Sequence, residues 1–390
     1  MGCVMFFTRE MDTFSTALEV YKPCFSKPQW THFNTYLTGL LLGEKGEKNI
    51  QDIAGNVLDG GHQSSLNRFI TKHRWDLRQL NAIRLRECLH ERTGGILSLD
   101  DTLIEKTGKA MGGVGYLYDS VQKKNILCHD IVSTFYRGSC AEQLPLYFKP
   151  YVKQDVAENS DIWFRTKIQI ALDLLRQSLM QVTPVAVVFD EWYMSQEVTE
   201  FLASRGLTWV SQAKTNRCIQ VGEAWVGLAT YARSLPAEAF MRVNAEVDEK
   251  RFKWFFETTV VMRKVGVIKL VVLRQRRNSR RFAFLVSNTT SLSGMQVLQY
   301  YKKRWVIEVF HRDCKQHLGF GEYQIRKLDC VVIHLHLVFL AYTLLKNVRS
   351  NPVLARIVAG TKSIGAACQR LKRWVFERLK GRVPFVRPST

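Results

Sequence analysis

Acidic residues stand at points where the pattern of the chain changes, and their chemistry suits metal-dependent catalysis. Asp100 and Asp101 close one short apolar run, Asp190 closes another, and Glu308 lies in a later helical pattern. In mixed α/β sheets, ligand-binding residues gather at the ends of strands. Carboxylates that converge there bind divalent cations, and two such ions about 4 Å apart can hold the attacking and leaving oxygens of a phosphodiester. For each acid taken alone, a structural cap at a strand-to-helix turn is the alternative.

The segment around Glu308 carries a polar stripe if it is helical. Advancing 100° per residue gathers five polar side chains into an arc of about 80°, with the apolar residues opposite. The five are Tyr301, Arg304, Glu308, Arg312 and Lys315. Such a stripe suits a phosphate backbone held beside a metal ligand, and we expect its cations and its tyrosine to bind DNA. A solvated amphipathic helix would show the same pattern.

The elements that would position these residues divide into five segments. They are a helical segment 1–92, alternating strands and helices in 93–214, strands alone in 215–288, helices in 289–345, and a basic helical end in 346–390. Adjacent strands followed by helix, strand, helix and strand predict a mixed α/β sheet. In the first segment, two short helices around Gly60 and Gly61 are compatible with a helix-turn-helix DNA-binding unit, and equally with an ordinary helical bundle.

The charge of the chain predicts an acidic partner. Its 390 residues include 56 Lys and Arg against 35 Asp and Glu, a net charge of +21. Nucleic acid or an anionic membrane could neutralise this excess. The stretch 263–281 holds eight cations and no acid, and the last 45 residues hold 11 cations and one acid. We expect both regions to lie along DNA.

The sequence argues against a membrane-spanning segment, a disulfide framework and a structural zinc site. The longest apolar run, 331–345, has 15 residues, fewer than the roughly 18 to 20 that cross a bilayer. We expect it to form a buried helix. The first residues lack the pattern of a signal peptide, which predicts a cytoplasmic, nucleoid-associated protein with no membrane partner. The nine cysteines are scattered without a Cys-x2-Cys pair, which argues against a disulfide framework and a structural zinc site.

The spacing Tyr301-x2-Arg304-x3-Glu308-x6-Lys315 resembles the Tyr-Arg-Glu-Lys signature of bacterial insertion-sequence transposases, a family with an Asp-Asp-Glu triad. The segment 188–193 is similar to the strand with the second acid in that family, and 99–109 to the strand with the first. The resemblance covers most of residues 93–345. The segments 25–30 and 64–69 are similar, more weakly, to helical leaders of some members.

The resemblance implies an RNase H-like catalytic core, interrupted by a β-strand insertion before the helix that bears the Glu. It implies that Asp190 and Glu308 bind the metal, expected to be two Mg²⁺ ions with Mn²⁺ able to substitute. The first ligand depends on alignment, because Asp-x-Thr selects Asp100 and Asp-Thr selects Asp101. We take Asp100, since RNase H-like folds often show Asp-x-Ser/Thr on this strand. The Tyr, Arg and Lys of the signature would contact DNA phosphates near the cut.

The implied activity is DNA transposition. Water cuts the DNA at the end of the element, and the freed 3′-hydroxyl then attacks target DNA. The partners would be the terminal inverted repeats and the target duplex, bound by a homodimer. One alternative is an inactive or domesticated relative that binds DNA as a regulator. A structure-selective nuclease on the same fold is another.

Overall fold

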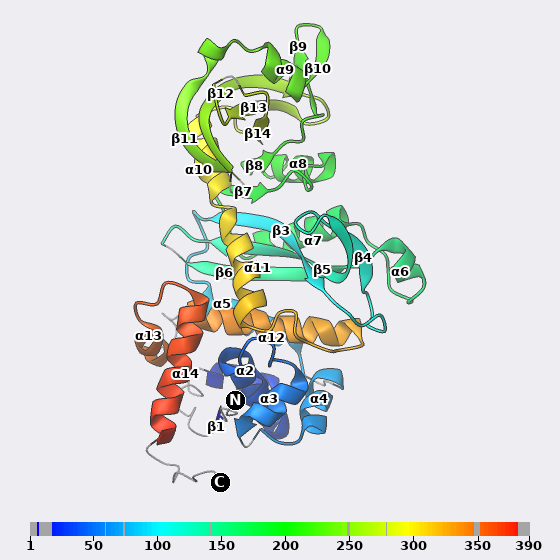
Figure 1. The fold of residues 1–390 in the computed structure, drawn as a ribbon, viewed down its shortest axis with the longest axis vertical. Coiled ribbons are helices and arrows are strands. Elements are labelled where there is room, and N and C mark those ends of the chain that lie inside the picture. The colour runs from blue at the N-terminus through cyan, green and yellow to red at the C-terminus, as the bar shows by residue number, and fades with distance from the viewer. Residues whose placement is uncertain are drawn as a thin grey trace.

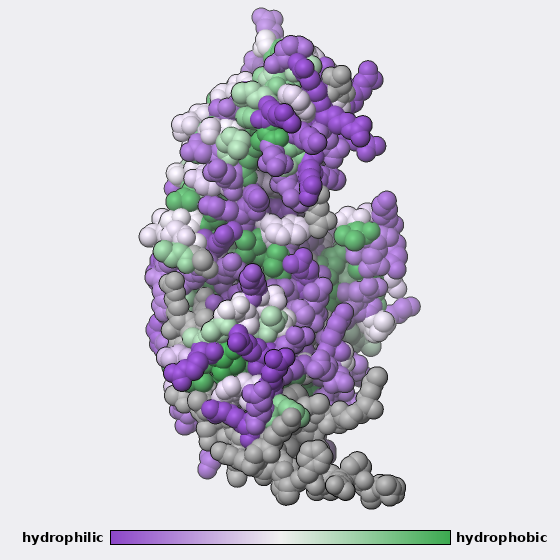
Figure 2. Space-filling model, turned by 60° about the vertical axis from the view of Figure 1, so that its left-hand side comes forward, coloured by the Kyte–Doolittle hydropathy of each residue, from purple (hydrophilic) through white to green (hydrophobic). Residues whose placement is uncertain are grey.

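The computed structural model describes residues 6–7, 18–58, 60–72, 75–140, 142–247, 250–277, 279–346 and 352–380. The molecule is elongated and has three tiers (Figure 1): helices at one end, a sheet with helices on both faces in the middle, and long curved strands at the other end. The face drawn in Figure 2 is mainly hydrophilic, with small, separate hydrophobic patches.

Local signals set the boundaries of the N-terminal helices. The elements are the 3-10 helix η2 (Glu19–Cys24) and the α-helices α2 (Lys27–Leu42), α3 (Ile50–Asn56), α4 (Gln63–Thr71) and α5 (Leu77–Cys88). Ser26 and Gln29 form a capping box at the start of α2, and Asn49 and Asp76 cap α3 and α5 through their side chains. These caps satisfy backbone amides that have no partner inside the helix. Two short strands, β1 (Phe6–Phe7) and β2 (Val57–Leu58), pair in parallel.

The middle tier is a mixed sheet, as predicted. Its strands are β3 (Ile96–Glu105), β4 (Gly115–Asp119), β5 (Lys124–Arg137), β6 (Gln143–Tyr151), β7 (Ala186–Phe189) and β8 (Trp209–Gln212). β7 runs parallel to both of its neighbours, β3 and β8. β3, β4 and β6 each pair antiparallel with β5. The intervening helices are α6 (Gln154–Glu158), α7 (Lys167–Leu179) and α8 (Gln196–Ala203).

The third tier extends the same sheet. It holds β9 (Cys218–Val221), β10 (Ala224–Gly227), β11 (Met241–Val247), β12 (Lys250–Met262), β13 (Gly266–Arg274) and β14 (Phe282–Ser287). β14 pairs with β8, so twelve strands form one sheet. The expectation of strands alone is wrong here, because the helix α9 (Leu228–Ser234) and the 3-10 turn η3 (Ala237–Ala239) interrupt them.

The cations of 263–281 do not form one stripe. The β13 strand has nine residues and spans about 30 Å, so it separates Arg263 and Lys264 from the cations that follow it. Lys269 lies 3.6 Å from the carboxylate of Glu257. Arg274 is 5% exposed and donates a hydrogen bond of 2.7 Å to a backbone carbonyl. Lys269 and Arg274 therefore form polar contacts within the protein. The expected continuous DNA-binding stripe is wrong at these two positions.

The helical segment that follows the strands is divided where one helix was expected. It consists of α10 (Gly294–Lys302) and α11 (Trp305–His317). At the junction, Lys303 and Arg304 donate backbone hydrogen bonds to the carbonyls of Tyr300 and Tyr301, which tightens the chain to a 3-10 turn. In Figure 1 the two helices run from the third tier down across the sheet. This break decides which way the residues before and after it point.

The C-terminal helices pack on the N-terminal ones. They are α12 (Leu328–Lys346), α13 (Pro352–Val358) and α14 (Ile364–Lys380). One hydrophobic core includes Phe33, Leu40, Phe310, Leu337 and Leu371, so helices from both ends of the chain share it with α11. The basic end of the chain, as far as Lys380, is thus part of the folded body. Residues 347–351 and 381–390 of the predicted segment lie outside the described residues.

The predicted buried helix is α12. The helix has 19 residues, and its most apolar 18-residue window has a mean hydropathy of 2.0, so by length and composition it could cross a membrane; 78% of that window is buried inside the protein. His334, in the middle of this helix, is hydrogen bonded to the Tyr36 hydroxyl at 2.8 Å. The contacts of α12 are those of a core helix.

Candidate active site

Two neighbouring parallel strands place Asp100 and Asp190 side by side. Leu99 on β3 is paired with Phe189 on β7, and each acid is the next residue of its strand or strand end. Adjacent strands lie about 4.8 Å apart, which brings the two carboxyl groups to one edge. Alternation along β3 turns Asp100 and Asp101 to opposite faces of the sheet. The Asp100 side chain faces the α10–α11 junction, and that of Asp101 faces α7.

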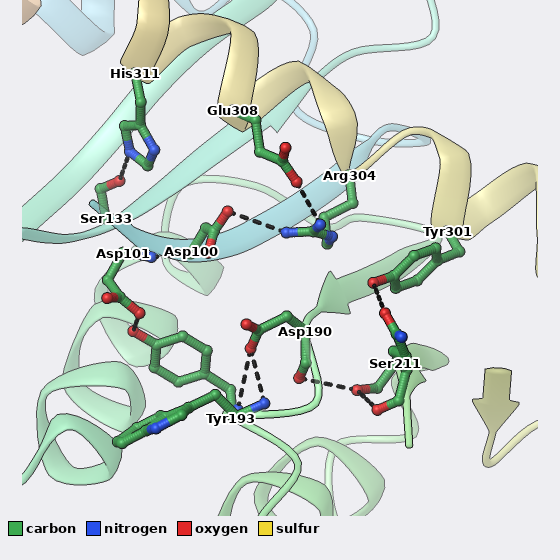
Figure 3. Close-up of polar contacts among 12 residues, drawn as sticks. Asp100, Asp101, Ser133, Asp190, Tyr193, Ser211, Tyr301, Arg304, Glu308 and His311 are labelled. Atoms are coloured by element: carbon green, nitrogen blue, oxygen red, sulfur yellow. Dashed lines mark hydrogen bonds and ion pairs between the residues drawn. The ribbon is translucent and has the colours of Figure 1, made fainter. Parts of the chain in front are cut away.

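Arg304 joins the first strand to the helix that carries Glu308. Its guanidinium donates to Asp100 Oδ2 at 3.0 Å and to Glu308 Oε1, one turn along α11 (Figure 3). The side chains of Arg304, Asp100 and Glu308 are 8%, 12% and 30% exposed. The structure thus brings Glu308 to the face that holds Asp100, with a cation between the two acids.

The turn after β7 holds Asp190 in place. Asp190 Oδ1 accepts backbone hydrogen bonds from Trp192 at 2.9 Å and Tyr193 at 3.3 Å, an Asx-type turn. The hydroxyl of Ser211 on β8 donates to the backbone carbonyl of Asp190 at 3.1 Å. Both contacts follow from the position of Asp190 at a strand end.

Burial and mutual repulsion dominate the electrostatics of the acids. Burial raises the pKa of Asp100 well above its usual range; the carboxylates of Asp190 and Glu308 act in the same direction, and Arg304 opposes them. Burial and the carboxylate of Asp101 raise the pKa of Asp190. For Asp101 burial is outweighed, because the ammonium of Lys167 and the hydroxyl of Tyr193 hold its pKa below the usual value. A cation added beside Asp100 and Asp190 would therefore stabilise their ionised forms and lower their pKa values.

The other residues of the expected stripe do not share one solvent-facing surface. Tyr301 precedes the break, is 3% exposed, and donates its hydroxyl to Gln212 Oε1 at 3.0 Å. Arg304 is buried between the acids. Arg312 and Lys315 are exposed on α11, and Lys315 lines a cavity of about 530 Å³ beside the loop after α2. The helix assumed for the projection breaks after Lys302, so Tyr301 does not belong to the stripe, whereas Arg304 and the later members stay together on α11.

A buried cluster behind the acids was not predicted. Lys167, the first residue of α7, contacts Asp101 Oδ2 at 2.8 Å and Asp130 Oδ2 at 2.5 Å, and the Tyr193 hydroxyl donates to Asp101 Oδ1 at 2.7 Å. The sequence could have pointed to Lys167, because a lysine at a helix N-terminus opposes the helix dipole and therefore needs an acidic partner. Nothing in the sequence near Asp130 points to its role, since its partners are remote in sequence.

His311 is a second residue that was not predicted. Its Nε2 lies 2.8 Å from the Ser133 hydroxyl, which links α11 to β5. Burial lowers the pKa of His311 to about 3, so the imidazole is neutral at ordinary pH.

The donor set fits a divalent cation by its chemistry. Three carboxylates, on β3, in the turn after β7 and on α11, offer hard oxygen ligands. The raised pKa values of Asp100 and Asp190 show that the site lacks enough positive charge to balance its carboxylates. Within the described residues, no three His, Cys, Asp or Glu side chains are drawn together tightly enough to hold a metal ion. Arg304 instead lies between Asp100 and Glu308.

Comparisons with known proteins agree with this architecture. The family described as DDE superfamily endonuclease matches residues 20–233, more than half of the chain, and the family described as transposase DDE domain matches residues 165–344. No curated protein matches the chain. A solved structure of the piggyBac transposase synaptic complex with hairpin DNA is similar, with a TM-score of 0.53 and 12% identity over 94% of this chain and 78% of that one. This likeness confirms the expected RNase H-like fold.

Proposed function

The chain belongs to the DDE superfamily of endonucleases and transposases, and we propose that it cuts and joins the ends of an insertion sequence. The family makes it a DNA-cutting enzyme that depends on a divalent metal ion. The proposed reaction is hydrolysis at the end of the element followed by transesterification into target DNA. A homodimer bound to the terminal inverted repeats is the proposed working form. The similar piggyBac structure is a synaptic complex with hairpin DNA, which supports a DNA partner.

We propose Asp100, Asp190 and Glu308 as the metal ligands. The observation that carries this assignment is the adjacency of Asp100 and Asp190 on parallel strands, with Glu308 linked to Asp100 through Arg304. Both carboxylate oxygens of Asp101 contact Lys167 or Tyr193 on the other face of the sheet. This engagement favours Asp100 over Asp101 as the first ligand.

Mg²⁺ ions bound by these acids would activate the attacking oxygen and stabilise the leaving one, the chemistry that two-metal sites supply. The side chains of the protein would hold the metal ions and orient the DNA. Arg312 and Lys315 are exposed on the helix that bears Glu308, and we assign them to the DNA backbone. Tyr301 shapes the wall of the site through Gln212. Arg304 neutralises Asp100 and Glu308, and with a metal ion held by these acids its guanidinium would be free to contact a phosphate.

The test is strand cleavage by acid-to-amide variants. Asp190→Asn and Glu308→Gln should each abolish cleavage of a duplex that carries the DNA flanking the gene, while binding to that duplex in EDTA persists. Asp173→Asn is the matched control, because Asp173 lies on α7 and its carboxylate pairs with Lys149 and Arg165, outside the site. This variant should cleave normally. Cleavage at the wild-type rate by either active-site variant would refute the assignment.

A further inference from the structure

The unpredicted cluster around Lys167 lies directly behind the proposed metal ligands. Lys167 is bonded to Asp101 at 2.8 Å and to Asp130 at 2.5 Å. Asp130 is completely buried, and the side chains of Lys167 and Asp101 are 13% and 19% exposed. A buried ion pair repays the cost of desolvation only when its geometry is good and its remaining atoms are bonded. Here one ammonium serves two carboxylates, one from β3 and one from β5. Asp101 accepts hydrogen bonds on both oxygens, whereas Asp130 is held by the ion pair alone, because neither of its oxygens has a hydrogen-bond partner within the described residues.

The position of Lys167 on its helix is unfavourable by itself. It is the first residue of α7, whose amides are capped by Thr166, and a cation at a helix N-terminus is destabilising. The two carboxylates offset this cost. The Lys167 ammonium also lies 5.0 Å from the ring centroid of Trp192 and 5.4 Å from that of Tyr151. The cluster therefore ties α7 to the strands and to the turn that holds Asp190.

The link to Asp190 runs through Tyr193. The Tyr193 hydroxyl donates to Asp101 Oδ1 at 2.7 Å, and the backbone amide of the same residue donates to Asp190 Oδ1 at 3.3 Å (Figure 3). Tyr193 is fully buried, so its ring cannot move without disturbing the core. Asp101 thus anchors the turn from one face of β3, while its neighbour Asp100 points to the other face.

We propose that Lys167, Asp101 and Tyr193 are positioning residues that fix the Asp190 turn relative to Asp100. Lys167 holds Asp101 as the acceptor for the Tyr193 hydroxyl, and Tyr193 holds the Asp190 carboxylate beside that of Asp100. This inference rests on the proposed function, because it concerns the same metal ligands. Partners that orient ligands in this way commonly change metal affinity by about 10- to 100-fold when removed.

The sharpest test is Tyr193→Phe, which removes one hydroxyl and keeps the ring. The Mg²⁺ concentration for half-maximal cleavage should rise about tenfold, and Mn²⁺ binding to the full-length protein–DNA complex, followed by electron paramagnetic resonance, should weaken equally. DNA binding in EDTA should not change. Tyr36→Phe is the matched control: it also removes a buried hydroxyl hydrogen bond, to His334, and its metal requirement should stay that of the wild type.

Lys167 is tested by charge. Lys167→Met should raise the Mg²⁺ requirement at least as much as Tyr193→Phe, and Lys167→Arg should restore part of the loss. A wild-type Mg²⁺ requirement and Mn²⁺ affinity in Tyr193→Phe would overturn the inference even if Lys167→Met failed to fold. If Asp190→Asn is inactive while Tyr193→Phe is normal, the positioning role alone fails. If Asp190→Asn cleaves normally, the proposed function fails.

Discussion

Arg304→Gln tests whether a guanidinium stands in for a cation between Asp100 and Glu308. The substitution removes the positive charge from a site where Arg304 and Asp100 are 8% and 12% exposed. Removing one partner of a buried pair costs about 3–5 kcal/mol. We take about 3 kcal/mol, because Glu308 is 30% exposed and water can stabilise it. Without metal, the variant should therefore be less stable than the wild type.

The expected shift is measurable by thermal unfolding. Unfolding entropy is about 2.1 cal/mol/K per residue, so a loss of about 3 kcal/mol in a chain of 390 residues corresponds to a drop of about 4 °C in the midpoint in EDTA. Binding of Mg²⁺ at about 100 times its Kd stabilises the folded protein by about 2.7 kcal/mol. The midpoint of the variant should thus rise more with Mg²⁺ than that of the wild type, because in the wild type the Arg304 guanidinium already neutralises the two carboxylates.

The matched control is Arg176→Gln. Arg176 also pairs with an aspartate, Asp173 at 3.2 Å, but is 53% exposed, and exposed pairs contribute about 0–1 kcal/mol. Its midpoint should stay within about 1 °C of the wild type, with or without Mg²⁺. Equal midpoints for Arg304→Gln and wild type in EDTA, or equal gains with Mg²⁺, would refute the reasoning.

Two further predictions concern the folded body and its charge. Burial lowers the pKa of Lys106 to about 7. Between about pH 7 and 10.5 the unfolded chain therefore binds more protons at this lysine than the folded protein does. The free energy of unfolding should rise with pH over this range, by up to about 1.4 kcal/mol per pH unit. Urea unfolding of Lys106→Met at pH 7.5 and 9 should lack this rise, and parallel profiles for variant and wild type would contradict the shift. Lys362 and Arg373 are exposed in the C-terminal region. If both contact phosphates, the double variant Lys362→Gln/Arg373→Gln should reduce the salt slope of DNA binding by about 1.8, whereas an unchanged slope in anisotropy titrations would place them off the DNA.

Local pattern was enough to locate much of the catalytic tier. Asp190 directly follows the end of β7, as predicted, because the breakers that bound such an element act within a few residues. The expected strand end at Asp100 is wrong, since β3 continues through its pairing with β5 to Glu105. The order of strands and helices therefore predicted the mixed sheet, and parallel neighbours then bring the two acids to one edge. The spacing around Glu308 likewise identified the third acid, although its assumed helix was too long.

Nonlocal contacts account for what the sequence could not predict. The break before Trp305 arises where α10 packs on β13 and β14 and α11 packs on β3 and β5. Tyr301 therefore leaves the helical face that begins with Arg304, and Arg304 is buried by its ion pairs with Asp100 and Glu308. The sequence predicted Arg274 to be a surface cation, but its side chain is buried and donates a hydrogen bond to a backbone carbonyl of α9. Pairing of β14 with β8 joins the insertion to the core sheet.

The charges illustrate the division most clearly. Composition determined a strongly basic chain, and the local pattern of residues identified Asp100, Asp190 and Glu308 as candidate metal ligands. Which cations face solvent, and which neutralise a buried carboxylate, depends on partners distant in sequence: Lys167 meets Asp101 and Asp130, and Arg304 meets Asp100. Such pairs form only when folding removes water from both charges, so they follow from the packing of strands and helices and not from spacing along the chain.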